Sequence, residues 1–379
     1  MAQVHGHCGP AFTKVQELIQ QNLLSEEELG LSLCVNINGT DVIDVWGGHA
    51  DQACSKPWTK DTITGVWSTT KCVTNLAALI LIDRGLLDPS AKVSQYWPEF
   101  GANGKEDTRV WHVLTHSAGL PAWEQPVSIE DLYDTQKATE RLAGQAPWWT
   151  PGSAPGYHAV TQGFMVGELV RRVTGKSVTD FIAEELVGPL DADFQLGAKE
   201  EDWSRVAELM PPPAFVPPPD FDPNSLPVRA GTSPLMEAEY SAMGGFRCAE
   251  IAGIGGFGNA KGIAKILSAL SLGGTVDGKK LLSPGAVRLA FTEQISGTDL
   301  VLGQQTRYGL GFGLPSEGGV SWIREGCCYW GGWGGSMAIM DVKNRVTICY
   351  TPSRMQNPGA NWDSRLDSYA KAIWDALGE

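Results

Sequence analysis

The 379-residue sequence lacks the apolar runs and nucleotide-binding motifs that mark several large classes of protein. It has no stretch of 18 or more apolar residues, so we expect no transmembrane helix and no membrane partner. The N-terminus lacks the basic segment and apolar run of a secretory signal, so we expect a cytoplasmic protein. Neither a phosphate-binding loop nor a dinucleotide fingerprint is present, and we expect no cofactor.

Regular cysteine spacing and an excess of positive charge are also missing. The eight cysteines form no C-x-x-C pair, so we expect reduced thiols, with a Cys327-Cys328 disulfide as the alternative. Lys and Arg number 29 against 43 Asp and Glu, which gives a formal charge of −14. An acidic surface repels phosphate groups, so nucleic acid is not an expected partner. We expect a neutral or apolar small molecule; the oligomeric state is not predicted.

The histidines match no metal motif or familiar triad. His5-Gly6-His7 resembles the start of an H-x-H-x-D-H zinc motif, but the later ligands are missing, and we expect no metal site. His116 and His158 suggest a Ser-His-Asp triad, yet the sequence has no G-x-S-x-G elbow. We therefore expect His116 to make structural hydrogen bonds in its loop and His158 to line the substrate pocket.

The spacing of apolar residues predicts a hairpin and a helix at each end of the chain. Asn38-Gly39 is typical of a tight hairpin turn, because both residues tolerate a positive φ. The predicted elements are a helix over 12–24, strands over 31–37 and 41–46, strands over 337–340 and 345–350 about a turn at 343–344, and a helix over 362–377.

Terminal strands with helical sequence between them predict a single catalytic domain over residues 1–379, of the α/β (α+β) class. We expect an antiparallel sheet flanked by helices from about 1–86 and 285–379, and a mostly helical subdomain from about 87–284. The active site is expected in the cleft between these parts. Residues 211–219 contain six prolines in nine positions and are predicted to form a loop that shapes the entrance.

The segment over residues 65–71 carries the strongest chemical signal. It leads into an apolar run that stops at Gly85, which predicts a helix with Ser68 in its first turn. Residues three apart share a helix face, so Lys71 can reach the Ser68 hydroxyl. A buried lysine has a lowered pKa and can then act as the base that activates a serine.

The same S-x-x-K pattern occurs again at Ser368 to Lys371, in the closing helix. There we expect only an exposed pair of side chains. On the pattern alone, Ser68 fits a nucleophile and a helix-capping serine about equally well, so its context has to decide.

That context resembles the serine β-lactamases, penicillin-binding proteins and their esterase relatives. After the S-x-x-K element, three more blocks are similar to that family in the same order. They are WHVLTHSAGLP at 111–121, PGSAPGYHA at 151–159 and WGGWGGS at 330–336. The resemblance extends over residues 12 to 375 and implies a β-lactamase/transpeptidase-like fold.

The resemblance also implies roles for individual residues. Tyr157 would join Ser68 and Lys71 in moving protons, and a cationic lysine beside it would lower the pKa of its phenol. The oxyanion hole would consist of the backbone N–H groups of Ser68 and Trp333. Gly331 and Gly332 would let the backbone approach the substrate carbonyl closely.

Two positions depart from the β-lactamase pattern. The family's Tyr-x-Asn element ends here in Ala159, and Trp330 replaces the lysine of the K-T-G element. Both changes remove polar groups that would orient a penicillin or a peptide. Because Trp-Gly-Gly is what the family VIII carboxylesterases carry here, the resemblance implies an esterase or transesterase with at most weak β-lactamase activity.

Several tryptophans near the motifs favour a site for an apolar acyl or aryl group, although about half of the 14 Trp are expected in the core. They are Trp67, Trp123, Trp148, Trp149, Trp330 and Trp333. The expected substrate-binding residues are Trp67, Trp149, His158, Trp330, Gly331 and Gly332.

The sequence thus predicts a serine hydrolase that acts through an acyl-enzyme on carboxylic esters or thioesters of apolar or aromatic small molecules. Three alternatives stay open: an acyltransferase or transesterase of natural-product biosynthesis, a D-amino-acid peptidase, and a non-catalytic scaffold. Ala159 and Trp330 disfavour the peptidase. A scaffold would not need Ser68, Lys71 and Tyr157 together.

Overall fold

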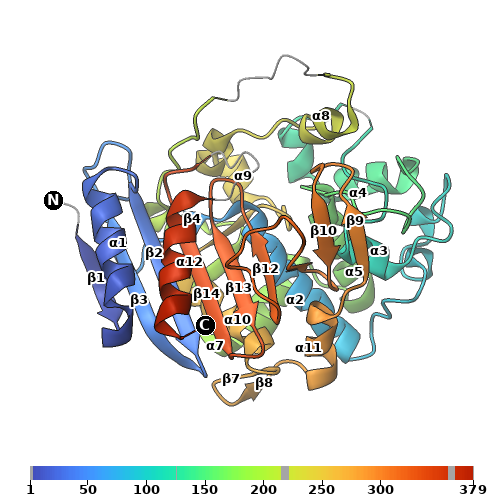
Figure 1. The fold of residues 1–379 in the computed structure, drawn as a ribbon. Helices are drawn as coiled ribbons and strands as arrows, with labels where there is room; N and C mark the ends of the chain where they lie inside the picture. The colour runs from blue at the N-terminus through green and yellow to red at the C-terminus, as the bar shows by residue number, and fades with distance from the viewer. Residues whose placement is uncertain (1–2, 125, 215–221, 357–362, 379) are drawn as a thin grey trace.

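The computed structural model describes residues 3–124, 126–214, 222–356 and 363–378. Its centre is a nine-stranded antiparallel sheet in the order β1-β3-β2-β14-β13-β12-β11-β10-β9 (Figure 1). The strands are β1 (Val4–Cys8), β2 (Gly30–Ile37), β3 (Thr40–Gly48), β9 (Ile295–Thr298), β10 (Gln305–Tyr308), β11 (Gly313–Leu314), β12 (Cys327–Gly331), β13 (Met337–Asp341) and β14 (Val346–Pro352). Because β2 pairs with β14, the two ends of the chain join in one sheet, as predicted.

Both predicted hairpins are present. Asn38 and Gly39 have φ of 51° and 88°, the left-handed conformation that a two-residue turn between β2 and β3 requires. Asp341 pairs with Val346 across the second hairpin, and its Oδ1 accepts the backbone N–H of Asn344 at 2.9 Å. The turn chemistry of the sequence therefore sets the register of these four strands.

Helices cover both faces of the sheet (Figure 1). Helices α1 (Thr13–Leu24) and α12 (Ser364–Ala376) pack together on one face, while α2 (Thr70–Asp83) and α10 (Ala260–Ser271) cover the other. Alternate side chains of β13 face these two layers: Met337 and Ile339 lie on the α1 and α12 side, Ala338 and Met340 on the α2 and α10 side. The predicted terminal helices are confirmed, although position 362 lies outside the described residues.

The remaining α-helices and strands are mostly short, and α5, α6 and α11 pack against α2. They are α3 (Val110–Leu114), α4 (Thr135–Gly144), α5 (Thr161–Thr174), α6 (Val178–Ile182), α7 (Gly188–Leu190), α8 (Leu226–Gly231), α9 (Gly244–Cys248), α11 (Pro284–Phe291), the sheet of β4 (Thr64–Gly65), β6 (Gly256–Gly258) and β5 (Phe194–Leu196), and the hairpin of β7 (Thr275–Val276) and β8 (Lys279–Lys280).

The division into an α/β part and a helical part remains a prediction, but one helix packs differently from what this division implies. Helix α10 falls inside the range 87–284 that was assigned to the helical part, yet it packs against β2, β13 and β14 of the main sheet. Residues 215–219 of the proline-rich segment lie outside the described residues.

No helix in the described part of the chain has the length and apolar character needed to cross a membrane. The cysteines are all free thiols, including Cys327 and Cys328.

Candidate active site

Ser68 lies where β4 leads into α2. It belongs to a single 3-10 turn, Trp67–Thr69, that directly precedes the helix. The turn is sharp: Trp67 has a φ of +45°, and the Thr70 Oγ1 donates to the Trp67 carbonyl at 2.5 Å. The same Thr70 oxygen accepts the backbone N–H of Gly256 at 2.8 Å. These bonds fix the turn against β6 and place Ser68 on the wall of a cavity.

Lys71 lies one helical turn beyond Ser68 and is 1% exposed. Its Nζ is 3.0 Å from the Ser68 Oγ, 2.6 Å from the Ala159 carbonyl oxygen and 2.9 Å from the Gly253 carbonyl oxygen. Burial lowers the pKa of Lys71 well below its ordinary value, because charged ammonium is poorly solvated there. Among the described residues no carboxylate lies within ion-pair distance to offset that cost.

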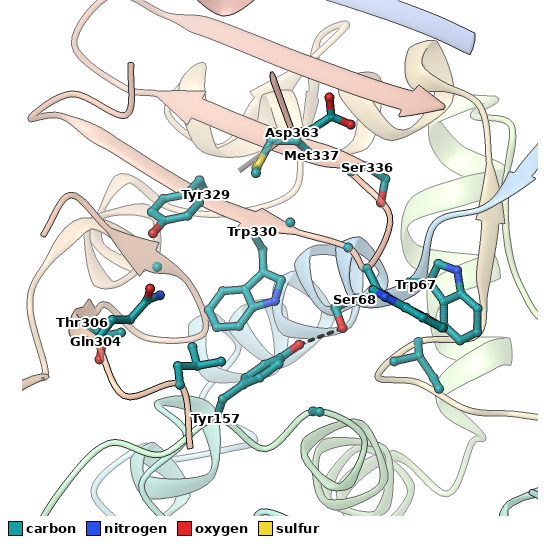
Figure 2. A pocket seen from close by; sticks show the side chains of 18 of the residues that line it. Trp67, Ser68, Tyr157, Gln304, Thr306, Tyr329, Trp330, Ser336, Met337 and Asp363 are labelled. Atoms are coloured by element: carbon teal, nitrogen blue, oxygen red, sulfur yellow. Dashed lines mark hydrogen bonds between the residues drawn. The ribbon is translucent and has the colours of Figure 1, made fainter. Parts of the chain in front are cut away.

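Tyr157 also contacts Ser68, and its ring centroid lies 5.1 Å from the Lys71 Nζ. Its hydroxyl donates to the Ser68 Oγ at 2.7 Å, the contact drawn as a dashed line in Figure 2. The expected lowering of the Tyr157 pKa is wrong: burial raises it to about 12, and the hydrogen bond with Ser68 offsets only part of that effect. The expectation assumed a cationic lysine, whereas burial disfavours the charged forms of both groups.

The loop after β12 is anchored to the turn that carries Ser68. The Ser336 Oγ donates to the Val66 carbonyl at 2.7 Å and lies 2.9 Å from the Thr69 Oγ1. A Cβ atom on Gly332 would lie 2.2 Å from both the Val66 carbonyl oxygen and the Ser336 Oγ, so only glycine fits there. The backbone N–H of Trp333 has no acceptor among the described residues, and Trp333 lines the same cavity as Ser68.

The cavity has a volume of about 690 Å³ and walls that are mostly apolar. Four of the expected substrate-binding residues line it: Trp67, Trp330, Gly331 and Gly332. The Trp67 and Trp333 rings meet edge to face, with centroids 5.0 Å apart. Figure 2 shows Trp330 beside the Tyr157 phenol and Trp67 on the far side of Ser68.

His158 and Trp149 do not reach the cavity, which corrects the expectation for both. The His158 ring is completely buried; its Nε2 accepts the Leu120 N–H at 2.9 Å, and its Nδ1 bonds the Gly156 carbonyl oxygen. Burial lowers the pKa of His158 to about 3. The half-buried Trp149 donates its indole N–H to the Ala154 carbonyl at 3.1 Å, so both rings bond within their own loop and neither lines the cavity.

His116 lies behind the cavity wall. Its Nδ1 accepts the His158 backbone N–H at 3.1 Å, and its ring stacks on Trp330 with centroids 4.8 Å apart. It therefore makes the structural hydrogen bond expected of it and also supports Trp330. Trp123 is a core residue, and Trp148 packs under the Arg229 guanidinium, so neither contributes to the cavity.

Part of the cavity wall carries no signal in the sequence. Met236, Ile254, Leu302, Gln304 and Thr306 lie on loops and a short strand far from the four motif blocks, and only the folded chain brings them to Ser68. Figure 2 shows Gln304 and Thr306 together on one side of this cavity.

The comparisons with known proteins agree with this geometry. The family described as Beta-lactamase matches residues 15–370. This chain belongs to the beta-lactamase family. Its fold is the β-lactamase/transpeptidase-like fold that the sequence predicts, and the family recognised from the four motif blocks is confirmed.

Several family members are similar over most of the chain. A family VIII carboxylesterase of known crystal structure shares 35% identity at a TM-score of 0.92, covering 99% of this chain and 100% of that chain. A penicillin-binding protein homologue from Caulobacter crescentus shares 32% identity at a TM-score of 0.89, with the same coverage. The esterase/beta-lactamase LipL of Mycobacterium tuberculosis (strain ATCC 25618 / H37Rv) is 34% identical over 301 residues, 74% of this chain and 67% of that protein.

Proposed function

We propose that the protein is a serine hydrolase that cleaves carboxylic esters through an acyl-enzyme on Ser68. The observation that carries this proposal is the environment of Lys71. A neutral amine has two N–H groups and one lone pair. The two N–H groups match the carbonyls of Ala159 and Gly253, so the lone pair is left for the Ser68 hydroxyl at 3.0 Å.

Lys71 then acts as the base. Because the amine is buried without a carboxylate partner, its neutral form is favoured, and it takes the proton as the Ser68 Oγ attacks the ester carbonyl. The backbone N–H groups of Ser68 and Trp333 stabilise the oxyanion that forms. Tyr157 keeps its proton at neutral pH and already donates to Ser68, so it is placed to protonate the leaving alcohol. The proton held by Lys71 then passes to Tyr157, so the amine is neutral again. A water molecule attacks the acyl-enzyme and gives its proton to Lys71, and the acid is released as the Ser68 Oγ takes that proton back.

The cavity supports apolar acyl or aryl groups as the part of the substrate that binds beside Ser68. Indole rings line it, and Trp330 occupies the place where β-lactamases carry a lysine for the substrate carboxylate. The names of the relatives fit esters better than β-lactams alone, since they include a family VIII carboxylesterase and an esterase/beta-lactamase. Neither the cavity nor these relatives favours transfer to an alcohol over hydrolysis, so we propose hydrolysis.

Intact-mass spectrometry tests the proposal. The wild-type protein mixed with p-nitrophenyl butyrate should gain the mass of one butyryl group during a burst of nitrophenol, and Ser68→Ala should show neither. Ser368→Ala is the matched control, because it removes the serine of the second S-x-x-K pattern and should behave like the wild type. An adduct that persists in Ser68→Ala would contradict the proposed nucleophile.

A further inference from the structure

A buried carboxylate lies directly behind Tyr157. Asp299 follows β9 in the loop to β10 and is completely buried. Its Oδ1 accepts the backbone N–H of Tyr157 at 3.0 Å and those of Val301 and Leu302 at 2.9 and 2.8 Å. Its Oδ2 accepts the Tyr308 hydroxyl at 3.0 Å. Burying a carboxylate raises the free energy of the folded state unless hydrogen bonds replace its contacts with water, and these four donors replace them.

The same carboxylate joins two parts of the site that are far apart in sequence. The Leu300 N–H donates to the Pro155 carbonyl at 2.9 Å, so the β9–β10 loop also bonds the segment just before Tyr157. Leu302 and Gln304 of this loop line the cavity. Asp299 therefore fixes the backbone that carries the phenol and the neighbouring stretch of cavity wall at once.

We infer that Asp299 is a positioning residue for Tyr157, holding its backbone so that the phenol stays within hydrogen-bond distance of Ser68. This inference rests on the proposed function, in which Tyr157 gives its proton to the leaving alcohol. Displacing a catalytic group by about 1 Å costs on the order of 10²-fold in rate. Loss of the hydrogen bond from the Tyr157 backbone N–H to Asp299 should therefore lower the rate measurably.

The leaving group separates a positioning role from a merely structural one. An alkoxide is a strong base and needs a proton as it departs, whereas p-nitrophenolate is stable and leaves without one. A displaced Tyr157 should therefore slow the hydrolysis of ethyl butyrate much more than that of p-nitrophenyl butyrate. Partial unfolding would lower kcat/KM for both esters by the same factor.

The experiment compares kcat/KM on the two esters for a set of variants, each with its melting temperature. Tyr157→Phe should lose about 10²-fold or more on ethyl butyrate beyond its loss on p-nitrophenyl butyrate. Asp299→Ala should lose about 10–10²-fold in kcat/KM on ethyl butyrate beyond its loss on p-nitrophenyl butyrate. Asp299→Asn should lie between Asp299→Ala and wild type, at about 3–10-fold, because a neutral acceptor makes weaker bonds than a carboxylate.

Asp341→Ala is the matched control. Asp341 is also a buried carboxylate that accepts a backbone N–H in a β-hairpin turn, but it does not line the cavity. This variant should melt at a lower temperature and change both esters by the same factor.

The outcomes separate the two levels of the argument. If Tyr157→Phe is selective and Asp299→Ala slows both esters equally, the inference is wrong while the proposed function stands. If Tyr157→Phe itself shows no selectivity, the proposed role of Tyr157 fails and the inference falls with it. Should Asp299→Ala not fold, Asp299→Asn decides: a selective loss supports the inference, and none overturns it.

Discussion

The two S-x-x-K patterns of this chain differ completely in their surroundings. Lys71 is buried, and its amine meets two backbone carbonyls and a serine that faces a cavity. Lys371 lies on the outer side of α12, has a side chain that is 56% exposed and pairs with Asp367 at 2.8 Å. The three-residue spacing brings the serine and the lysine of each pattern close together, but only Lys71 of the two lysines is buried, and burial lowers its pKa.

Replacing each lysine by alanine is the strongest test of that difference. Lys71→Ala removes the proposed base and should lower kcat on p-nitrophenyl butyrate by about 10⁴-fold. Lys371→Ala removes only an exposed ion pair, should leave kcat unchanged and should alter stability by less than about 0.5 kcal/mol. Steady-state kinetics on both variants, with circular dichroism to confirm folding, checks the prediction. Comparable losses in the two variants would show that burial does not distinguish the sites.

A second, smaller effect concerns the loop after β12, which packs against the Ser68 turn and has no counterpart beside Ser368. Gly332→Ala would force a Cβ atom into the Val66 carbonyl and Ser336 Oγ, so the Trp333 N–H should move away from the oxyanion. We expect kcat to fall by about 10²–10³-fold, the usual cost of losing one oxyanion donor. Gly144→Ala is the control, because no atom lies within 4 Å of the Cβ it would add. Equal activity in the two variants would contradict the role given to this loop.

Much of this arrangement could be predicted from the sequence, because the signals are local. The Asn38-Gly39 turn, the apolar helix after Ser68 and the ordered motif blocks each depend on neighbouring residues. Strands β9 to β11 could not be predicted, since they are two to four residues long and are specified only by their pairing in the sheet. The same holds for Asp299, whose role depends on a hydrogen bond to a residue 142 positions away.

The errors at His158 and Trp149 have a common physical cause. His158 was assigned to the cavity because it follows Tyr157 in the sequence, and Trp149 because it is a tryptophan close to a motif block. Neighbouring side chains of a loop point in different directions. Hydrogen bonds to the Leu120 N–H and the Gly156 carbonyl hold the His158 ring inside the protein, and a bond to the Ala154 carbonyl holds the half-buried Trp149 ring against its own loop. The Tyr157 pKa was wrong for a related reason: desolvation acts on both partners of the pair, and it outweighs the charge that either would offer the other.

The central claim is that a neutral Lys71 activates Ser68, and the pH dependence of Ser68 labelling by a fluorophosphonate tests it most directly. A base works only when deprotonated, so the labelling rate should rise with pH and then level off. The midpoint of this rise should lie well below the ordinary lysine pKa of 10.5, and the rate should stay level up to about pH 12, the value to which burial raises the pKa of Tyr157. Peptide mapping should place the adduct on Ser68 alone. A rate that keeps rising in proportion to hydroxide through pH 10, or an adduct on another serine, would contradict the account.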